Sequence, residues 1–526
     1  MPTSTLRADV AIVGSGFAGS LTALALRRLG RSVVMLERGR HPRFAIGESS
    51  TPLANLLLEQ LCDTYGLDAV RPLAKYGTWQ RAYPDIPCGL KRGFSFYHHF
   101  AVASFADDRR HAHQLLVAAS PHDEVSDMHW YRPAFDGFLA AQAGLAGVTH
   151  LDETAITSVR LEHDGVFLQG DRLGRPVSMH ADFLIDASGP RGFLHRALGL
   201  EEAPLEWLPP TRALYAHFTD VELWQDVAPG STDAQPPFPV DAAALHHVFP
   251  GGWIWVLRFN NGITSAGAAV TNEVAAAVGL ERGAEAWPRL LERLPSVRRQ
   301  FARAKAVTPF VYAPRLAFRS RAVVGTRWAM LPSAAGVIDP LLSTGFPLTL
   351  LGIQRLVERL DRCWGGQGLD AALEEYAGQT RRELDATERL VAALYASMSD
   401  FELFKRLTLL YFAAASFSET ARRLGRAGRA EGFLLCDDAV FAPELRACAE
   451  AAMQRPAAAA RSALIERIDA AIEPFDVAGL GDRGRRDWYP VLAEDLIRAA
   501  PRLGAGEREV QALLERCGFA EAGTGP

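Results

Sequence analysis

Lysine is scarce in this sequence, and long apolar runs are absent. Of its 56 basic residues only four are lysines, and all the others are arginines. No apolar stretch approaches the roughly 18 residues that a membrane-spanning helix needs. The N-terminus carries one positive charge and runs directly into a strand-like stretch, so it lacks the regions of a signal peptide. We therefore expect a cytoplasmic protein with no membrane partner. The lysines are Lys75, Lys91, Lys305 and Lys405.

Closely spaced cysteines are also missing. The six cysteines lie far apart, with no CxxC pair and no histidine at zinc-finger spacing. We therefore expect reduced thiols and no metal site. The net charge of -5 gives no electrostatic reason to expect a nucleic-acid partner. With 526 residues, 48% of them hydrophobic, the chain is long enough for two to four domains around a large core.

The N-terminus carries a pattern typical of dinucleotide-binding proteins. Residues 8 to 13 read as a buried strand, residues 14 to 19 as a tight GSGFAG turn, 20 to 29 as a helix and 32 to 36 as a second strand. In such a unit Gly14 makes the turn, Gly16 lets the backbone approach a pyrophosphate, and Gly19 allows close helix packing. Glu37, after the second strand, accepts hydrogen bonds from a ribose. We therefore predict a dinucleotide site here.

A second GxGxxG pattern lies at residues 479 to 484. It follows EPFDVA rather than a buried strand, and it leads into RRDWYP rather than a helix. Because the pattern binds nucleotides only between a strand and a helix, we interpret this segment as a loop.

Two further regions follow the N-terminal unit. From about 90 to 260 short strands alternate with turn signals, most clearly in a meander at 246 to 249, 253 to 259 and 264 to 270. After about 347 the apolar period becomes helical, with amphipathic stretches at 369 to 397, 401 to 414, 457 to 473 and 505 to 516. We expect an antiparallel sheet flanking the first domain and a mostly α-helical C-terminal region.

Several segments resemble the p-hydroxybenzoate hydroxylase-like flavoprotein superfamily, in the family's order. They are Pro42-Arg43, Gly47-Glu48-Ser49, the stretch YRPAFDGFL with Arg132, Asp186-Ala187-Ser188-Gly189, and Gly336 to Pro340. The resemblance implies an FAD-binding Rossmann-like fold. The cofactor-binding residues expected are Gly14, Gly16, Ala18, Gly19, Glu37, Arg38, Arg43, Glu48, Ser49, Arg132, Gly189 and Asp339. One departure is Pro332-Ser333, where the family has a Gly-Asp pair that contacts the flavin.

The fold class is accordingly α/β, with boundaries that the segments suggest. Residues 1–205 and 306–360 are assigned to the FAD-binding domain, and 206–305 to a substrate-facing β-sheet region with contributions from 85–135. Residues 361–526 form the C-terminal helical region.

Within that superfamily the chain resembles the flavin-dependent halogenases, above all phenol-type members such as those acting on phloroglucinol. The resemblance rests on GESSTP (47 to 52), CGLKRGFSF (88 to 96), HHVFPGGWIWVLRFNN (246 to 261), YAPRLAFRS (312 to 320) and IDPLLSTGF (338 to 346). It implies that reduced FAD, oxygen and chloride or bromide yield hypohalous acid, which reaches a lysine beside the substrate. The lysine at the family position is Lys91.

The chemistry explains why that position needs a lysine. A desolvated ammonium loses its proton near neutral pH and then binds or reacts with hypohalous acid, whereas guanidinium stays charged. Because side chains alternate along a strand, we expect Lys91 to share a face with Gly93 and Ser95, whose small side chains leave room, while Phe94 and Phe96 take the other face. A surface lysine beside Arg92 is the plainer interpretation.

The resemblance also implies a substrate pocket with aromatic walls, formed by Trp253, Trp255, Phe94 and Phe96. Trp253 and Trp255 match the two tryptophans of the family's WxWxIP motif, although they also fit a sandwich core. The match ends at Leu257-Arg258. Arg258 then either binds an acidic substrate or reaches solvent from the opposite face.

The segment Ser343-Thr344-Gly345-Phe346-Pro347 is typical of a helix N-terminus. Ser343 or Thr344 is expected to cap it, and Pro347 suits its first turn. Free amides at such an end attract anions. We therefore predict a halide site at Thr344 and Gly345, next to or instead of contacts with the flavin ring.

The residue at position 342 bears on the substrate, and the lack of an NAD(P)H domain bears on the partner. Tryptophan halogenases carry a glutamate where this chain has Leu342, which favours a small phenol-like aromatic substrate. No segment marks a dedicated NAD(P)H domain, so a separate flavin reductase is the expected partner. Two alternatives remain open: a flavin monooxygenase or dehydrogenase that does not halogenate, suggested by Arg258 and Pro332-Ser333, and a flavin-binding protein without catalysis.

Overall fold

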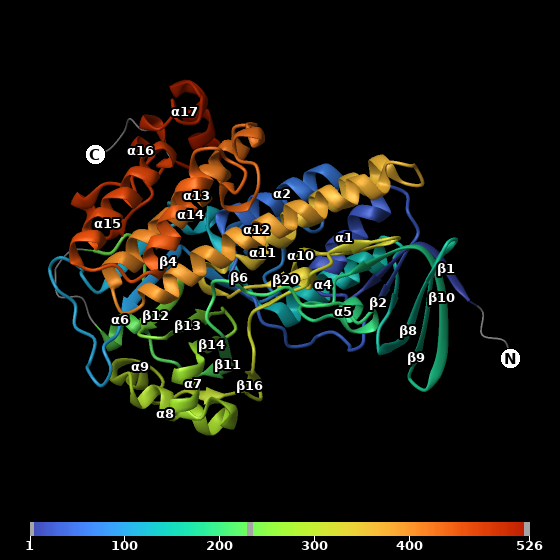
Figure 1. Ribbon diagram of the computed structural model, residues 1–526, viewed down its shortest axis with the longest axis horizontal. Helices are drawn as coiled ribbons and strands as arrows, with labels where there is room; N and C mark the ends of the chain where they lie inside the picture. The colour runs from blue at the N-terminus through green and yellow to red at the C-terminus, as the bar shows by residue number, and fades with distance from the viewer. Residues whose placement is uncertain (1–4, 229–234, 520–526) are drawn as a thin grey trace.

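The computed structural model describes residues 5–228 and 235–519. Two β-sheets lie side by side, and helices from the C-terminal third cover one side of both (Figure 1). Helix α11 (Gly345–Cys363) packs against α1 (Phe17–Arg28) and α2 (Pro52–Tyr65), and so joins the helical region to the first sheet. Among these described residues, no helix combines the length and apolar character needed to cross a membrane.

The first sheet carries the predicted βαβ unit. Strands β1 (Leu6–Val13) and β2 (Val33–Leu36) pair in parallel, and β10 (Arg175–Asp186) pairs in parallel with the other side of β1. The expected helix boundary is wrong by three residues, since α1 begins at Phe17 with Gly16 as its N-cap. Gly16 is in extended conformation (φ -68°, ψ -179°), so the helix starts inside the glycine motif and its first amides point toward the turn.

The second sheet contains the predicted meander. Strands β12 (Ala244–Phe249), β13 (Gly252–Arg258) and β14 (Thr264–Thr271) are antiparallel neighbours, and β14 continues onto β11 (Thr211–Thr219). On the other side β12 pairs in parallel with β4 (Gly93–His98). The outer face of this sheet is buried beneath α7 (Asn272–Val278), α8 (Ala286–Glu292) and α9 (Pro295–Gln300).

The residue Lys91 does not belong to that sheet. It ends β3 (Cys88–Lys91), which pairs with β6 (Asp127–Trp130) in a two-stranded antiparallel ladder. Arg92 separates β3 from β4, so the alternation of side chains does not continue from Lys91 to Phe94. The register of this ladder places Lys91 opposite Asp127 and Leu90 opposite Met128.

The C-terminal helices follow the predicted amphipathic stretches. The structure has α12 (Leu369–Ser397), α13 (Phe401–Arg423), α15 (Ala458–Ile472) and α17 (Glu507–Arg516), so α13 runs nine residues beyond its prediction. The second GxGxxG segment is a loop, as expected, followed only by a short 3-10 turn at Arg483–Arg485. One apolar core continues from the first sheet into α11, α12 and α13, so the C-terminal helices share their core with the first sheet.

Candidate active site

The glycine turn after β1 has the geometry that a dinucleotide site needs. Gly14 has φ +105°, and a Cβ on it would lie 2.6 Å from the carbonyl oxygen of Ala187. A Cβ on Gly19 would overlap the carbonyl oxygen of Gly14. A Cβ on Gly16 would lie 3.4 Å from both Nη2 of Arg43 and Oδ2 of Asp136, and 3.6 Å from Nη2 of Arg132. Two guanidinium groups therefore face the middle glycine, which fits a pyrophosphate passing close to the backbone.

The carboxylate of Glu37 lies at the end of β2 beside this turn. It accepts hydrogen bonds from the amides of Gly39 (2.8 Å) and Ser15 (3.1 Å) and pairs with Arg43 at 3.2 Å. Burial raises the pKa of Glu37, but these two amides and the Arg43 charge outweigh that effect and hold the pKa below its usual value. An ionised acceptor at this position fits a ribose hydroxyl.

Two further predicted cofactor residues are fixed by buried bonds. Arg132 binds both carboxylate oxygens of Asp136 at 2.7 Å and donates to the carbonyl oxygen of Gly47 at 2.9 Å. Glu48 is buried and lies 2.8 Å from Nε2 of His217. The segment that follows the second strand is thereby held against the glycine turn.

The remaining cofactor residues are spread along the same edge of the sheet. Ala18 is buried in the first turn of α1, and Arg38 is exposed just after Glu37. Gly189 has φ +86°, with open space where a Cβ would be. Asp339 accepts from the hydroxyl of Tyr395 at 2.9 Å, and burial raises the pKa of its carboxyl to about 6.

The start of α11 differs from its prediction in one respect. In the part of the chain that the structure describes, neither Ser343 nor Thr344 caps the helix through its side chain. Leu342 and Ser343 have left-handed φ values of 68° and 57°, so a 3-10 turn leads directly into the helix. Thr344 is buried, whereas Gly345 is exposed. The helix end therefore opens at Gly345 without the expected cap.

The ammonium of Lys91 is completely buried, contrary to the surface interpretation. Its Nζ donates to Oγ of Ser49 at 2.8 Å and to the carbonyl oxygen of Ser50, and it lies 3.7 Å from the centre of the Phe94 ring. The expected assignment of faces is therefore wrong, because the break at Arg92 turns Lys91 toward Phe94. Burial lowers the pKa of Lys91 well below its usual value, although the Asp127 carboxylate raises it in part.

The two small residues near Lys91 also do not leave the space that was expected. A Cβ on Gly93 would overlap the carbonyl oxygen of Val117 and lie 2.7 Å from the ring of Phe238. Ser95 donates to the carbonyl oxygen of Val240 at 3.2 Å. Both residues are small because other chain segments pack closely against them.

The predicted tryptophan pair lies on β13, and both side chains are part of the protein core. Trp253 and Trp255 are buried with ring centres 5.5 Å apart, and Nε1 of Trp255 donates to Ser265 at 3.3 Å. Arg258 faces away from them and donates to Asp241 at 3.1 Å and to the carbonyl oxygen of Val221 at 2.9 Å. Its charge is therefore paired within the fold on the face opposite the tryptophans, where the side chain is partly exposed, and no acidic substrate is needed to neutralise it.

The other departure, Pro332-Ser333, has a packing role. Pro332 opens the short helix α10 (Pro332–Ala335), and a Cβ on Gly352 of α11 would overlap its ring. The substitution for Gly-Asp therefore allows α10 and α11 to pack closely. Although this chain lacks the aspartate of the Gly-Asp pair, the buried carboxyl of Asp339 follows a few residues later.

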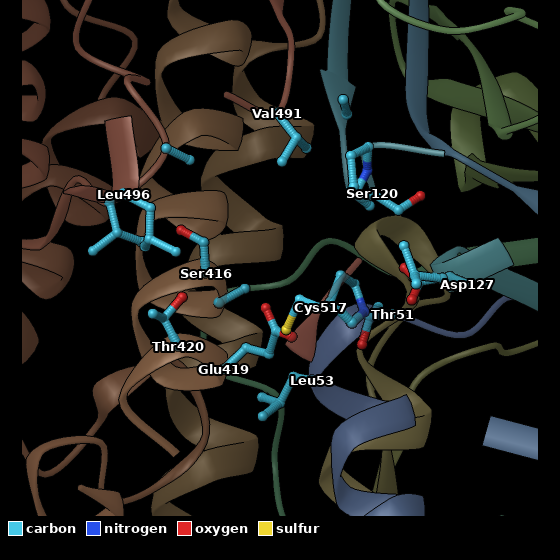
Figure 2. A pocket seen from close by; sticks show the side chains of 18 of the residues that line it. Thr51, Leu53, Ser120, Asp127, Ser416, Glu419, Thr420, Val491, Leu496 and Cys517 are labelled. Carbon is cyan, nitrogen blue, oxygen red and sulfur yellow. The ribbon is translucent and has the colours of Figure 1, made fainter. Parts of the chain in front are cut away.

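A cavity of about 180 Å³ lies between α2, β5 (Gln114–Ala118), α13 and the C-terminal segment, and Lys91 is not among the described residues that line it. Phe94 and Asp127, the ring and the carboxylate beside Lys91, both line it. Asp127 and Ser120 lie on one side of this space, opposite Ser416 and Glu419 of α13 (Figure 2). Of the four residues predicted to line a substrate pocket, Phe94 lines this cavity. Phe96, Trp253 and Trp255 are buried behind it, around His246.

The carboxylate of Asp127 was missed by sequence reasoning. It lies in the strand DMHW, and burial raises its pKa well above the usual value, although the Lys91 charge lowers it in part. A single acid in an otherwise apolar strand, five residues before the Arg132 motif, was the available signal. The register that pairs it with Lys91 depends on contacts between segments far apart in the chain, which the sequence does not reveal.

Comparison with known proteins agrees with this geometry. The tryptophan halogenase family model matches residues 127–404, and an NAD(P)-binding Rossmann-like model matches residues 12–83. The monodechloroaminopyrrolnitrin halogenase PrnC of Pseudomonas fluorescens is 30% identical, over 81% of this chain and 75% of that protein. The tetracycline 7-halogenase of Kitasatospora aureofaciens is 28% identical, over 77% and 73%. The crystal structure of the halogenase PltM in complex with phloroglucinol and FAD is 26% identical, with a TM-score of 0.79, over 91% of this chain and 99% of that one.

Proposed function

The chain belongs to the tryptophan halogenase family of flavin-dependent halogenases, and from this premise we propose that it halogenates an electron-rich, phenol-like aromatic substrate. It is thus an FAD-dependent enzyme whose co-substrates are oxygen and chloride or bromide. When bound, reduced FAD would supply the two electrons that activate oxygen, and oxygen is the oxidant that converts halide into hypohalous acid.

The residues proposed to hold FAD surround the glycine turn. Gly14, Gly16 and Gly19 bring the backbone to the pyrophosphate, whose charge meets Arg43 and Arg132. The ionised Glu37 accepts the ribose hydroxyls. The other proposed cofactor residues lie along the same edge: Ala18, Arg38, Glu48, Ser49, Gly189 and Asp339.

The proposal rests above all on the buried ammonium of Lys91. Within the described residues every other lysine either pairs with a carboxylate within 4 Å or is exposed, whereas Nζ of Lys91 contacts a hydroxyl, a carbonyl and an aromatic ring. Its pKa is lowered by burial, so a neutral amine is accessible near neutral pH. A neutral amine captures the electrophilic halogen and passes it to the ring of the substrate.

The adjoining cavity suits a small hydroxylated aromatic molecule. Phe94 and Phe412 supply aromatic walls, and Ser416 and Glu419 supply hydrogen-bond acceptors for hydroxyl groups. The proximity of this cavity to Lys91 supports a substrate site there. The halide is proposed to bind at Thr344 and the exposed Gly345, where α11 begins.

A separate flavin reductase is the proposed source of reduced FAD. The hydroxylase alternative rested on Arg258 and Pro332-Ser333. Because Arg258 is paired with Asp241 and Pro332 packs on Gly352, neither departure calls for a different reaction.

The decisive experiment is a halogenation assay. The enzyme is incubated with a flavin reductase, NADH, FAD, bromide or chloride, and a panel of activated phenols, and products are detected by mass spectrometry. We expect halide-dependent products with the halogen isotope pattern. Oxidised products that form equally well without halide would instead support the monooxygenase.

A further inference from the structure

Asp127 and Lys91 are an acid and a base that face each other on neighbouring strands inside the protein. They are directly opposite each other in the β3–β6 ladder, and both side chains are buried. Directly opposed residues of an antiparallel pair have Cβ atoms about 5 Å apart and lie on the same face. Among the described residues Nζ of Lys91 donates to Ser49 and Ser50, and Asp127 accepts from Asn55, so the two side chains are not hydrogen-bonded to each other. A proton that passes between them therefore needs a bridging water.

One oxygen of the Asp127 carboxylate is free for such a role. Oδ1 accepts from Nδ2 of Asn55 at 2.7 Å, whereas Oδ2 is buried and has no hydrogen-bond partner among residues 5–228 and 235–519. A buried acceptor without a partner costs free energy, so it is retained where a ligand, water or proton uses it. Because Asp127 also lines the cavity, it lies where the halogenating species and the substrate are proposed to meet.

We propose that Asp127 is the proton shuttle of Lys91. This inference rests on the proposed function. Asp127 first takes a proton from the Lys91 ammonium, giving a neutral amine and a neutral carboxylic acid. The amine then attacks the halogen of hypohalous acid: an N–X bond forms, the O–X bond breaks, and its electron pair leaves with oxygen. Asp127 returns its proton to that oxygen, so water leaves and the carboxylate is restored. The halogenated amine finally transfers the halogen to the substrate ring, and the proton that the ring loses passes through the Asp127 carboxylate to the amine, which restores the Lys91 ammonium.

The surroundings favour one shared proton. Burial lowers the pKa of Lys91 and raises that of Asp127, so transfer from one to the other replaces two buried charges by two neutral groups. Such a pair titrates as a unit. The titratable or polar groups around it are His129 on β6, His246 on β12, Asn55 on α2, Lys75 before α3 (Tyr76–Ala82), and Glu419 and Tyr411 on α13.

Those neighbours do not replace Asp127. Burial lowers the pKa of His129 and of His246 to about 3, so both stay neutral at working pH. Glu419 is paired with Arg423, and Lys75 lies 3.9 Å from Glu59. Asp127 is therefore the acid closest in register to Lys91 that has a free oxygen.

The pH dependence of turnover tests the inference. In the wild type, kcat for halogenation should fall at alkaline pH, as the pair loses its single proton. Asp127→Asn should lower kcat about 100-fold or more, leave KM nearly unchanged, and abolish this alkaline limb. Asp127→Glu keeps a carboxylic acid and should restore both the limb and part of the rate. Asp487→Asn is the matched control, because it removes another buried carboxylate that faces a lysine, Lys405, outside this cavity.

A second variant leaves Asp127 in place. The hydrogen bond from Asn55 lowers the pKa of Asp127, so Asn55→Leu should move the alkaline limb to higher pH. This test does not depend on the stability of Asp127→Asn. An unchanged limb in Asn55→Leu, or an Asp127→Asn enzyme with wild-type kcat, would overturn the shuttle alone. A wild type that makes no halogenated product would overturn the proposed function as well.

Discussion

Nζ of Lys91 lies 3.7 Å from the centre of the Phe94 ring, although the two residues belong to different strands. The ring covers one side of the ammonium, and the hydroxyl of Ser49 and the carbonyl of Ser50 accept hydrogen bonds from it. The lysine is thus held rigidly in a desolvated place, and the same ring forms a wall of the cavity. This contact links the proposed nucleophile with the proposed substrate site.

Lys91→Arg should abolish halogenation. Arginine keeps the positive charge but does not become a neutral nucleophile, so product formation should fall at least about 100-fold, as in Lys91→Met. Reoxidation of reduced flavin should continue, because the glycine turn is unchanged, and free hypohalous acid or peroxide should appear. Product is measured by mass spectrometry and oxygen uptake with an electrode. The exposed Lys305→Arg is the control, and near wild-type halogenation by Lys91→Arg would rule out this role.

Gly16→Val should weaken FAD binding about tenfold or more. Its Cβ would enter the space between the turn and the Arg43 and Arg132 guanidinium groups, where the pyrophosphate is proposed to lie. Flavin affinity is measured by fluorescence quenching. Gly144→Val, at an exposed helical position with open space around it, controls for the added side chain. Equal affinity in a folded Gly16→Val variant would show that the cofactor lies elsewhere.

The sequence predicted those parts of the fold that depend on local periodicity. The βαβ unit, the meander and the long helices follow from apolar spacing and turn residues that lie within a few positions of each other. The start of α1 was wrong because Gly16 both ends the turn and caps the helix. Ser343 and Thr344 were expected to cap α11, but the preceding left-handed residues direct the chain into a 3-10 turn instead.

The site was predicted only in part, for a similar reason. Family motifs located Lys91, Glu37 and the glycine turn, whose roles depend on short segments. Lys91 points toward Phe94 because the strand breaks at Arg92. It lies opposite Asp127 because of the β3–β6 register. Both are set by packing between distant segments. Packing also explains why residue 93 is a glycine. The sequence suggested that this glycine leaves room beside Lys91, but the space is filled by Val117 and Phe238.

Bromide should bind where α11 begins. The amides near Thr344 and Gly345 lie at the positive end of a 19-residue helix, and Gly345 is exposed without a side chain. Crystals soaked in bromide with FAD bound should show anomalous density next to these amides. Density confined to surface sites elsewhere would contradict the halide assignment.

Ala415→Phe should impair substrate binding more than flavin chemistry. Ala415 lines the cavity of about 180 Å³ from α13, and a phenyl group there would fill much of that space. We expect kcat/KM for the aromatic substrate to fall about tenfold or more, at an unchanged rate of flavin reoxidation. Steady-state kinetics measured beside oxygen uptake separates the two. An unaltered kcat/KM would place the substrate outside this cavity.

Acidification should destabilise the fold through its buried histidines. Burial lowers the pKa of His129, His246 and His247 to about 3 and that of His98 to about 4, whereas a histidine in the unfolded chain keeps its ordinary pKa of 6.5. Between these values the unfolded chain binds more protons than the folded one. The free energy of unfolding therefore falls as the pH drops below about 6.5.

The size of this effect is measurable. At pH 5 each such histidine contributes a loss of about 2 kcal/mol relative to pH 7, since one pKa unit corresponds to about 1.4 kcal/mol. Urea unfolding at both pH values should show the drop, and His247→Gln should reduce it, because glutamine does not titrate. His163→Gln, at an exposed position, should leave the drop unchanged. Equal pH dependence in the His247→Gln and wild-type proteins would mean that His247 is already protonated in the folded state despite its burial, which lowers its pKa.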